Sequence, residues 1–303
     1  MARLPDPRHH RRGNGCPPGL RVAAGTAPDG FPPLHDRLLD PRTGDAAGRP
    51  GLLERLPLAA DGAVMGGGLR RGADIEIGSA TAIGHVRQRQ EDRLLAVPPI
   101  IAVADGMGGL EDGDMAAERM IEELTAMELD GSTAQARAEI KRAIARAARA
   151  IGPRSGTTVV GAVLARATAT HSWLVFHVGD SRMYSYADGE LEALTTDHSL
   201  VQELIDTGML GREEARYDPR RSIVTRAVGA DVCADPAFRH VAAGGQILLA
   251  CSDGVTDELS EWEIAEILGR GGGLDHIAQA LVEAALEAGG GDNATVVLAR
   301  ASA

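Results

Sequence analysis

Residues Ile100 to Gly109 read I-I-A-V-A-D-G-M-G-G, and our interpretation of the whole chain starts from this stretch. The uninterrupted apolar run is typical of a strand that is buried on both faces. The run ends at Asp105, and the glycines after it are typical of a tight turn that brings the backbone close to a ligand. An unpaired carboxylate is very costly to bury. We therefore expect Asp105, at the end of a buried strand, to bind a metal ion.

The pattern of an apolar strand that runs into Asp-Gly occurs a second time, at Asp253-Gly254. Two more acidic segments, Glu91-Asp92 and Gly291-Asp292-Asn293, each come directly before a predicted strand. Carboxylates at strand ends can converge at one edge of a sandwich, and oxygen ligands suit hard cations such as Mg²⁺ or Mn²⁺. Asp-Gly is also a common turn sequence, so one copy alone indicates little. The recurrence after buried strands is what predicts a metal site.

The composition excludes several classes of protein. The 303 residues carry a net charge of −12, which makes nucleic acid and anionic membranes poor partners. Aromatic residues make up only 3%, too few for a platform that stacks single-stranded nucleic acid. Cys16, Cys233 and Cys251 form no C-x-x-C motif, so they indicate neither a zinc site nor a disulfide framework. No apolar run approaches the length of a membrane span. We expect a cytoplasmic protein.

The first part of the chain differs in composition from the rest. Ten of the fifteen prolines lie before residue 58, and residues 1–64 hold nine Arg against seven acidic residues. Such a segment cannot bury enough apolar surface to offset its ordering entropy. We expect a disordered tail over residues 1–72 and one folded domain over residues 73–303. The composition also changes close to Met65, which leaves open that translation starts there.

From Ala73 onward, strands surround a central pair of helices, and more helices follow near the end. We expect strands at 75–82, 94–97, 100–104, 158–166, 172–178, 183–186, 190–194, 223–227, 238–241, 246–251 and 294–299. We expect helices from 112 or 114 to 129 and at 133–151, 199–206, 212–216, 261–268 and 274–287. This order is not a β-α-β-α alternation. It favours antiparallel sheets covered by helices over a doubly wound parallel sheet.

Seven short motifs follow one another along the folded part. They are G-H-V-R-Q-R-Q-E-D at 84–92, V-A-D-G-M-G-G at 103–109, S-G-T-T at 155–158, V-G-D-S-R at 178–182, T-x-D-H-S at 195–199, C-S-D-G-V at 251–255 and G-D-N-A-T at 291–295. Each motif alone is weak. In this order they resemble the bacterial type 2C, or PPM, family of metal-dependent serine/threonine protein phosphatases, over about residues 73–300.

The resemblance implies an α+β fold, namely an α-β-β-α sandwich of two antiparallel sheets flanked by helices, with a binuclear metal site at one end. It implies two Mn²⁺ or Mg²⁺ ions, held by a set of carboxylates and one carbonyl oxygen. These ligands are Glu91, Asp105, the carbonyl of Gly106, Asp253 and Asp292, with Asp105 bridging both ions. Asp92 and Asn293 would lie next to the ligands. Arg87 would bind the substrate phosphate, although Arg89 is equally available by composition.

The resemblance also implies a reaction. A metal-activated water would attack the phosphorus of phosphoserine or phosphothreonine in a single displacement, with Arg87, Asp105 and Asp253 as catalytic residues. The expected partners are phosphorylated proteins, including Ser/Thr kinases and their substrates, with no nucleic acid and no membrane, and we expect a monomer. Two alternatives stay open: a pseudophosphatase that binds phosphoproteins, and a phosphatase of anti-sigma-factor antagonists. A link to type VI secretion would rest on the habits of the family alone.

Three departures from the family pattern affect these expectations. Met107 stands where some members carry a histidine proposed as general acid, so His85 and His198 become candidates, unless both are structural. Gly152 to Arg154 replace an aspartate that many bacterial members carry, so we expect a third metal to be weak or absent. The Arg-rich segment from Gly208 to Arg221 matches the variable flap of the family, and it either selects substrates or is a solvated loop.

Overall fold

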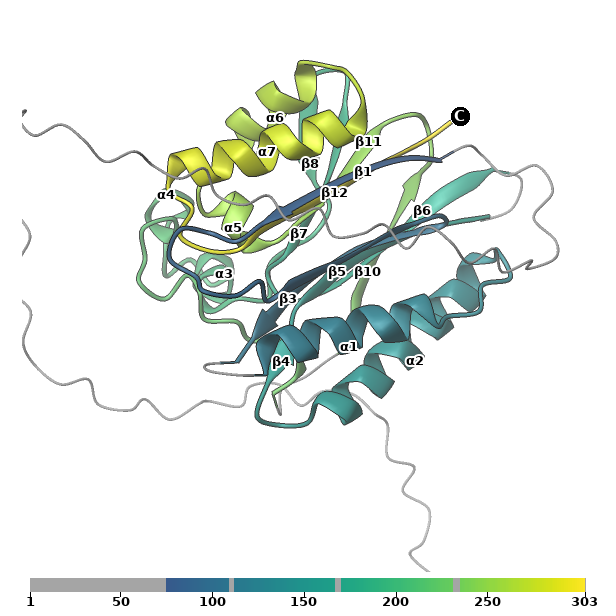
Figure 1. Cartoon of the computed structure of the whole chain (residues 1–303), viewed down its shortest axis with the longest axis horizontal. Coiled ribbons are helices and arrows are strands. Elements are labelled where there is room, and N and C mark those ends of the chain that lie inside the picture. The colour runs from purple at the N-terminus through teal and green to yellow at the C-terminus, as the bar shows by residue number, and fades with distance from the viewer. Residues whose placement is uncertain (1–74, 109–111, 167–169, 231–234, 303) are drawn as a thin grey trace, which may run out of the picture. The chain divides into compact units, whose positions relative to one another are not determined.

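Two antiparallel sheets lie face to face, and helices cover both outer faces (Figure 1). The computed structural model describes residues 75–108, 112–166, 170–230 and 235–302. The predicted tail of residues 1–72 therefore lies outside the described residues. The arrangement confirms the expected α+β sandwich. No helix in the described ranges is long and apolar enough to cross a membrane.

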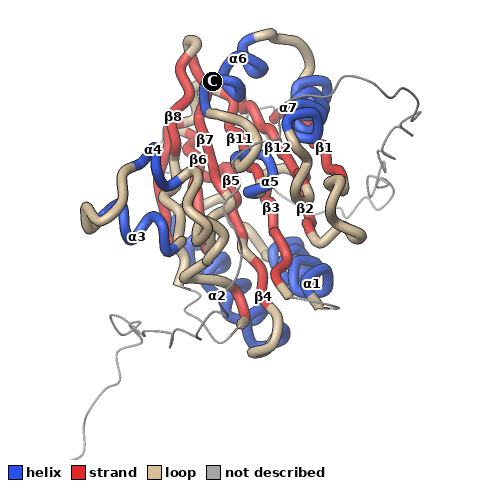
Figure 2. The backbone as a smooth tube through the Cα atoms, turned by 90° about the vertical axis from the view of Figure 1, so that its left-hand side faces the viewer, coloured by secondary structure: helices blue, strands red, loops and turns tan. Residues whose placement is uncertain are grey.

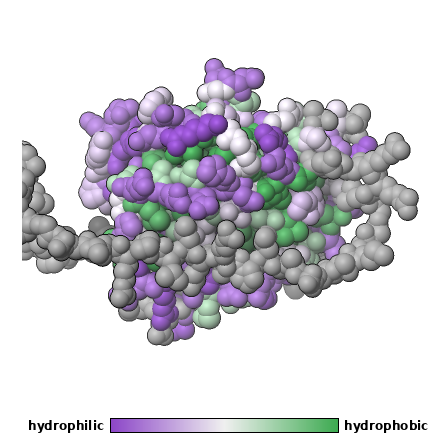
Figure 3. Space-filling view, turned by 45° about the horizontal axis from the view of Figure 1, so that its top comes forward, coloured by the Kyte–Doolittle hydropathy of each residue, from purple (hydrophilic) through white to green (hydrophobic). Residues whose placement is uncertain are grey.

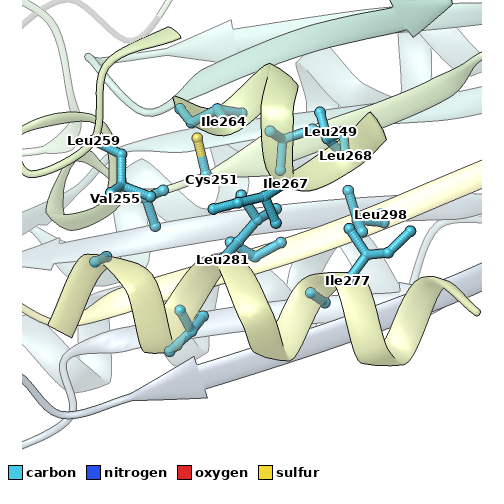
Figure 4. Packing of buried hydrophobic residues seen from close by; sticks show 14 of the residues in the cluster. Leu249, Cys251, Val255, Leu259, Ile264, Ile267, Leu268, Ile277, Leu281 and Leu298 are labelled. Atoms are coloured by element: carbon cyan, nitrogen blue, oxygen red, sulfur yellow. The ribbon is translucent and has the colours of Figure 1, made fainter. Parts of the chain in front are cut away.

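The first sheet has the strand order β1-β12-β11-β7-β8. Its strands are β1 (Ile75–Ala82), β7 (Arg182–Ala187), β8 (Glu190–Ala193), β11 (Ile247–Cys251) and β12 (Ala294–Ala301). Helices α6 (Glu261–Gly269) and α7 (Leu274–Ala288) cover its outer face (Figure 1). Figure 4 shows Ile267 and Leu281 of these helices pointing toward Leu249 of β11. Burying such a side chain completely stabilises the fold by about 1.5–3 kcal/mol, and this contact holds α6 and α7 on the sheet.

The second sheet has the order β10-β6-β5-β3-β4-β9, and β2 pairs with β3 beside this path. Its strands are β2 (Asp92–Val97), β3 (Ile100–Met107), β4 (Gly156–Thr157), β5 (Val159–Arg166), β6 (His171–Val178), β9 (Val228–Gly229) and β10 (Ala237–Ala242). Helices α1 (Gly113–Thr125) and α2 (Thr133–Ile151) cover its outer face. Ser132 caps α2 by accepting a hydrogen bond from the Gln135 N–H, and Gly152, at φ 79°, follows its last turn.

The central strand β3 is buried on both faces, as its apolar run predicts. Ile101 and Val103 face the other sheet, in a cluster with Trp173 and Leu248. The alternating residues, Ala102 among them, face α1 and α2. Hydrophilic residues cover much of the surface in Figure 3, and hydrophobic residues show between them. Since β3 is fixed from both sides, its last residues are held rigidly at the end of the sandwich.

Some expectations about local structure were wrong. The segment 223–227 is not a strand, because Val224 only bridges Ser199 and the paired residues are Val228 and Gly229 of β9. The Asp253-Gly254 pair does not form a plain turn but begins the short helix α5 (Asp253–Thr256). Helix α1 ends at Thr125 and does not reach residue 129. Two short helices, α3 (Leu200–Asp206) and α4 (Arg212–Ala215), occur where expected.

Candidate metal centre

Four aspartates gather at the end of the sandwich where β3 and β11 end, the end that Figure 2 faces. Asp92 lies opposite Asp105 in the pairing of β2 with β3. Asp253 follows β11 and interacts directly with Asp105. Asp180, in the turn after β6, lies close enough to both to affect their charge. Segments that are far apart in the sequence therefore bring their carboxylates together, as the strand-end pattern predicts.

Burial and mutual repulsion make these carboxylates hard to ionise. Burial, together with the neighbouring aspartates, raises the pKa of Asp92 to about 7 and that of Asp253 to about 6. The same two causes hold the pKa of Asp105 and that of Asp180 well above the usual range. Such a cluster favours a bound cation, because positive charge offsets the repulsion.

The donor atoms fit a hard divalent cation. All the side chains concerned offer carboxylate oxygens, which suit Mg²⁺ and Mn²⁺. Oδ1 of Asp253 is buried and has no hydrogen-bond partner among the described residues. An unsatisfied buried oxygen of this kind is costly, and a cation would satisfy it.

Arg87 joins two of the predicted ligands. Its Nη2 lies 2.5 Å from Oδ2 of Asp292, and its Nη1 lies 3.8 Å from Oε2 of Glu91. Within residues 75–108, 112–166, 170–230 and 235–302, no three His, Cys, Asp or Glu side chains have the spacing of a formed metal site. At Asp292 and Glu91, the positive charge of the Arg87 guanidinium offsets the negative charge of the two carboxylates. Arg89 is exposed, and its side chain forms no hydrogen bond or ion pair with the residues that the structure describes.

The Asp-Gly glycines have a different role from the one that the sequence suggests. Neither Gly106 nor Gly254 has a positive φ. A Cβ on Gly106 would lie 2.1 Å from the Gly113 carbonyl oxygen, and one on Gly254 would lie 2.1 Å from the Asn293 carbonyl oxygen. These glycines therefore permit close contact between backbones and are not there for a tight turn. Gly113 is also close to both Oε1 of Glu91 and the Gly106 carbonyl, which brings these two predicted ligands together.

Asn293 and Asp92 hold the ligand-bearing segments together. Asn293 Oδ1 accepts a hydrogen bond from the Glu91 N–H at 2.9 Å, and its Nδ2 donates to the Arg89 carbonyl at 3.0 Å. Asp92 accepts a hydrogen bond from Ser252 Oγ at 2.8 Å. The loop before β2, the start of α5 and the start of β12 are thereby connected directly, next to Glu91, Asp253 and Asp292.

The S-G-T-T motif fixes the end of β3. Oγ1 of Thr157 donates to the Asp105 carbonyl at 2.9 Å, and the Asp105 N–H donates to Oγ1 of Thr158 at 3.2 Å. Thr158 Oγ1 also lies 2.7 Å from Ser181 Oγ, beside Asp180. The two threonines therefore fix the backbone position of Asp105.

Sequence reasoning did not identify Asp180 as a site residue. V-G-D-S-R entered only as one of the seven motifs, with no role for Asp180, yet Asp180 is buried beside Asp253. The available signal was that this motif, too, places an aspartate directly after an apolar strand. Asp180 and Asp253 lie at the wall of a cleft of about 630 Å³, which Arg212, Arg216 and Trp262 also line.

Neither histidine that was considered as general acid is free to donate a proton. His85 Nε2 lies 3.0 Å from the Leu286 carbonyl, and its backbone N–H donates to Gly290. Burial, with smaller contributions from His177 and Arg226, lowers the pKa of His198 to about 3. The contacts therefore favour the structural interpretation of both residues.

Known proteins share this sequence pattern. The family model described as Protein phosphatase 2C matches residues 85–287. The chain is 36% identical over 229 residues to the serine/threonine protein phosphatase PstP of Mycobacterium tuberculosis, a match that covers 71% of this chain and 43% of that relative. It is 36% identical over 214 residues to the serine/threonine phosphatase stp of Listeria monocytogenes, a match that covers 66% of this chain and 83% of that relative.

The fold is similar to that of solved structures as well. The catalytic domain of the phosphatase PstP in complex with two manganese ions superimposes with a TM-score of 0.65 at 30% identity, over 76% of this chain and 99% of that chain. The family model's range of residues 85–287 contains five of the seven motifs completely, begins one residue into the motif at 84–92 and ends before the motif at 291–295. The chain therefore belongs to the protein phosphatase 2C family.

Proposed function

We propose that this chain is a Mn²⁺- or Mg²⁺-dependent phosphatase of phosphoserine and phosphothreonine in proteins. The main support is the convergence of Asp105, Asp253 and Asp180 at one end of the sandwich, beside a buried carboxylate oxygen that lacks a partner. The relatives in the same family that are named serine/threonine phosphatases point the same way. The catalytic domain would comprise residues 73–303.

In this proposal Glu91, Asp105, the Gly106 carbonyl, Asp253 and Asp292 would hold the two cations. When bound, the cations supply positive charge that lowers the pKa of a water and offsets charge on the phosphoryl oxygens. Arg87 binds a phosphoryl oxygen through its planar guanidinium, which can form two parallel hydrogen bonds. Asn293 and Asp92 keep the ligand-bearing segments in register.

The proposed partners are phosphorylated proteins, including Ser/Thr kinases and their substrates. In this proposal the chain acts on them as a monomer in the cytoplasm.

Cys251, the cysteine in the described part of the chain, is a buried free thiol, and burial raises its pKa to about 12. A thiol with this pKa is not a nucleophile near neutral pH. Cys251 therefore belongs to the core, although it lies two residues before Asp253.

Metal removal provides the main test of the proposed function. The full chain, supplied with Mn²⁺, is expected to hydrolyse p-nitrophenyl phosphate and a phosphothreonine peptide. EDTA is expected to reduce both rates to background, and added Mn²⁺ to restore them. Since a ligand of the folded state stabilises it, Mn²⁺ should also raise the unfolding temperature. A rise in unfolding temperature without hydrolysis of any phosphopeptide would instead support the pseudophosphatase.

Arg87 and Arg89 form a matched pair for testing phosphate binding. Arg87→Ala is expected to lower kcat/KM for a phosphopeptide by about 10- to 100-fold, since a charge-assisted hydrogen bond contributes about 1.5–3 kcal/mol. Arg89→Ala removes a solvated charge two residues away and should change kcat/KM by less than about twofold. Steady-state kinetics at saturating Mn²⁺ measure both variants. If both variants lost kcat/KM equally, the phosphate would be attracted by the overall positive charge of the loop and not bound by Arg87 in particular.

A further inference from the structure

The turn that carries Asp180 is held at Gly179. Gly179 has φ 108°, a conformation that favours glycine, and an added Cβ would lie 2.6 Å from Thr158. One side of the turn therefore packs against the S-G-T-T motif. The position of the Asp180 carboxylate depends on what holds the other side.

His198 holds the other side through both polar backbone groups of Gly179. The Gly179 N–H donates to Nδ1 of the His198 ring at 3.1 Å. The His198 backbone N–H donates to the Gly179 carbonyl at 2.9 Å. His198 thus provides a hydrogen-bond partner for both the N–H and the carbonyl of Gly179. The two hydrogen bonds fix the position and orientation of the turn.

The His198 ring is itself fixed. It stacks on His177, with ring centres 4.5 Å apart and planes inclined by 8°. His177 Nε2 lies 2.9 Å from the Thr196 carbonyl, two residues before His198. Nδ1 of His198 thus serves as the acceptor for Gly179, while Nε2 on the other side of the ring lies 3.4 Å from Nη1 of Arg226. The pKa of about 3 keeps this ring neutral over the range in which phosphatases are assayed.

The backbone of His198 also holds the flap. The Thr225 N–H donates to the His198 carbonyl at 2.7 Å, and Leu200 donates to Ile223 at 2.9 Å. The segment between these two bonds includes α3, α4 and the residues that line the cleft beside Asp180. His198 therefore connects the Asp180 turn to the base of the flap.

From this arrangement we propose that His198 is a positioning residue, which holds the Asp180 carboxylate beside Asp253 through the two hydrogen bonds to Gly179. The inference rests on the proposed function, because a misplaced Asp180 lowers activity only if the acidic cluster is the reaction site. His198 itself does not contact the substrate.

Three substitutions separate the possible roles of His198. His198→Asn places an amide oxygen where Nδ1 lies, so the acceptor remains while the stacking is lost. His198→Phe keeps the stacking on His177 but removes the acceptor, and His198→Ala removes both. His276→Ala, at an exposed histidine of α7, is the control for replacing a histidine.

Two measurements on the full chain decide the matter. Hydrogen exchange of the Gly179 amide, followed by NMR without metal, should stay slow in His198→Asn and become fast in His198→Phe and His198→Ala. At saturating Mn²⁺, kcat for p-nitrophenyl phosphate should stay within about threefold in His198→Asn and fall by about 10- to 100-fold in the other two, with KM nearly unchanged.

If His198→Phe kept both slow exchange of the Gly179 amide and full kcat, the proposal would be overturned. Equal losses of kcat in His198→Asn and His198→Phe would also overturn it. An unmutated chain that hydrolyses no phosphoester with Mn²⁺ would overturn the proposed function instead. In that case the exchange measurement would still show whether His198 holds the turn.

Discussion

Asp105→Asn is expected to lower kcat/KM for phosphopeptides by about 10³-fold or more, the scale of removing a group that stabilises developing charge in a reaction site. Asp105 lies near the end of β3, a strand that is buried on both faces, and its backbone is fixed by Thr157 and Thr158. Asparagine has nearly the same shape but no negative charge, so the geometry survives while the proposed bridging ligand is lost.

The stability of the same variant provides an independent readout. Without metal, Asp105→Asn removes one carboxylate from a buried cluster of like charges, so the unfolding temperature should not fall. Mn²⁺ should raise the unfolding temperature of the unmutated chain clearly and that of the variant much less. Calorimetry with and without Mn²⁺ measures both effects.

Asp235→Asn is the matched control for Asp105→Asn. Its side chain is 65% exposed and pairs with Lys141 at 3.3 Å, an arrangement that contributes little to stability. Activity and the response to Mn²⁺ should match those of the unmutated chain. If Asp105→Asn kept more than about a tenth of the activity, Asp105 would not be the bridging ligand that family chemistry requires.

Gly254→Ala is expected to destabilise the fold by about 3 kcal/mol, at the upper end of the usual cost of overpacking. The new methyl group would lie 2.1 Å from the Asn293 carbonyl oxygen, and backbone atoms cannot move aside as a flexible side chain can. The start of α5 would be pushed away from the start of β12. Asp253 and Asp292 would separate, so activity should be lost even where the chain still folds.

Gly273→Ala is the matched control for this glycine. Gly273 has φ −71°, and nothing lies within 4 Å of an added Cβ. A change from glycine to alanine at this N-cap should cost about 1 kcal/mol, so about a third of the cost at Gly254, because alanine is a poorer N-cap residue than glycine. Urea unfolding of both variants tests the comparison, and equal midpoints would contradict the proposed backbone contact.

Local signals in the sequence predicted much of the fold. The burial of β3 followed from its uninterrupted apolar run, and the helix expected at 133–151 has the bounds of α2. Asp188-Gly189 predicted the hairpin between β7 and β8, where both residues have the positive φ that a type I′ turn requires. Each of these features depends on residues that are close in the sequence.

What the sequence did not predict depends on contacts between distant segments. The Arg87 ion pair with Asp292 joins residues 205 positions apart. The Asp-Gly sequence suggested that Gly254 is a turn glycine. Its contact with Asn293 depends on the fold and cannot be inferred from the residues next to it. Asp180 did carry a local signal, an aspartate directly after an apolar strand, but its place beside Asp253 becomes evident only in the folded chain.

The position of β12 between β1 and β11 has a consequence for how the protein is made. Asn293, just before β12, supports the loop that carries Arg87 and Glu91, about 200 residues upstream. A nascent polypeptide on the ribosome thus contains the predicted ligands Glu91 and Asp105 long before β12 can bring them together with Asp253 and Asp292. We therefore expect the nascent chain to have no phosphatase activity until β12 has been translated.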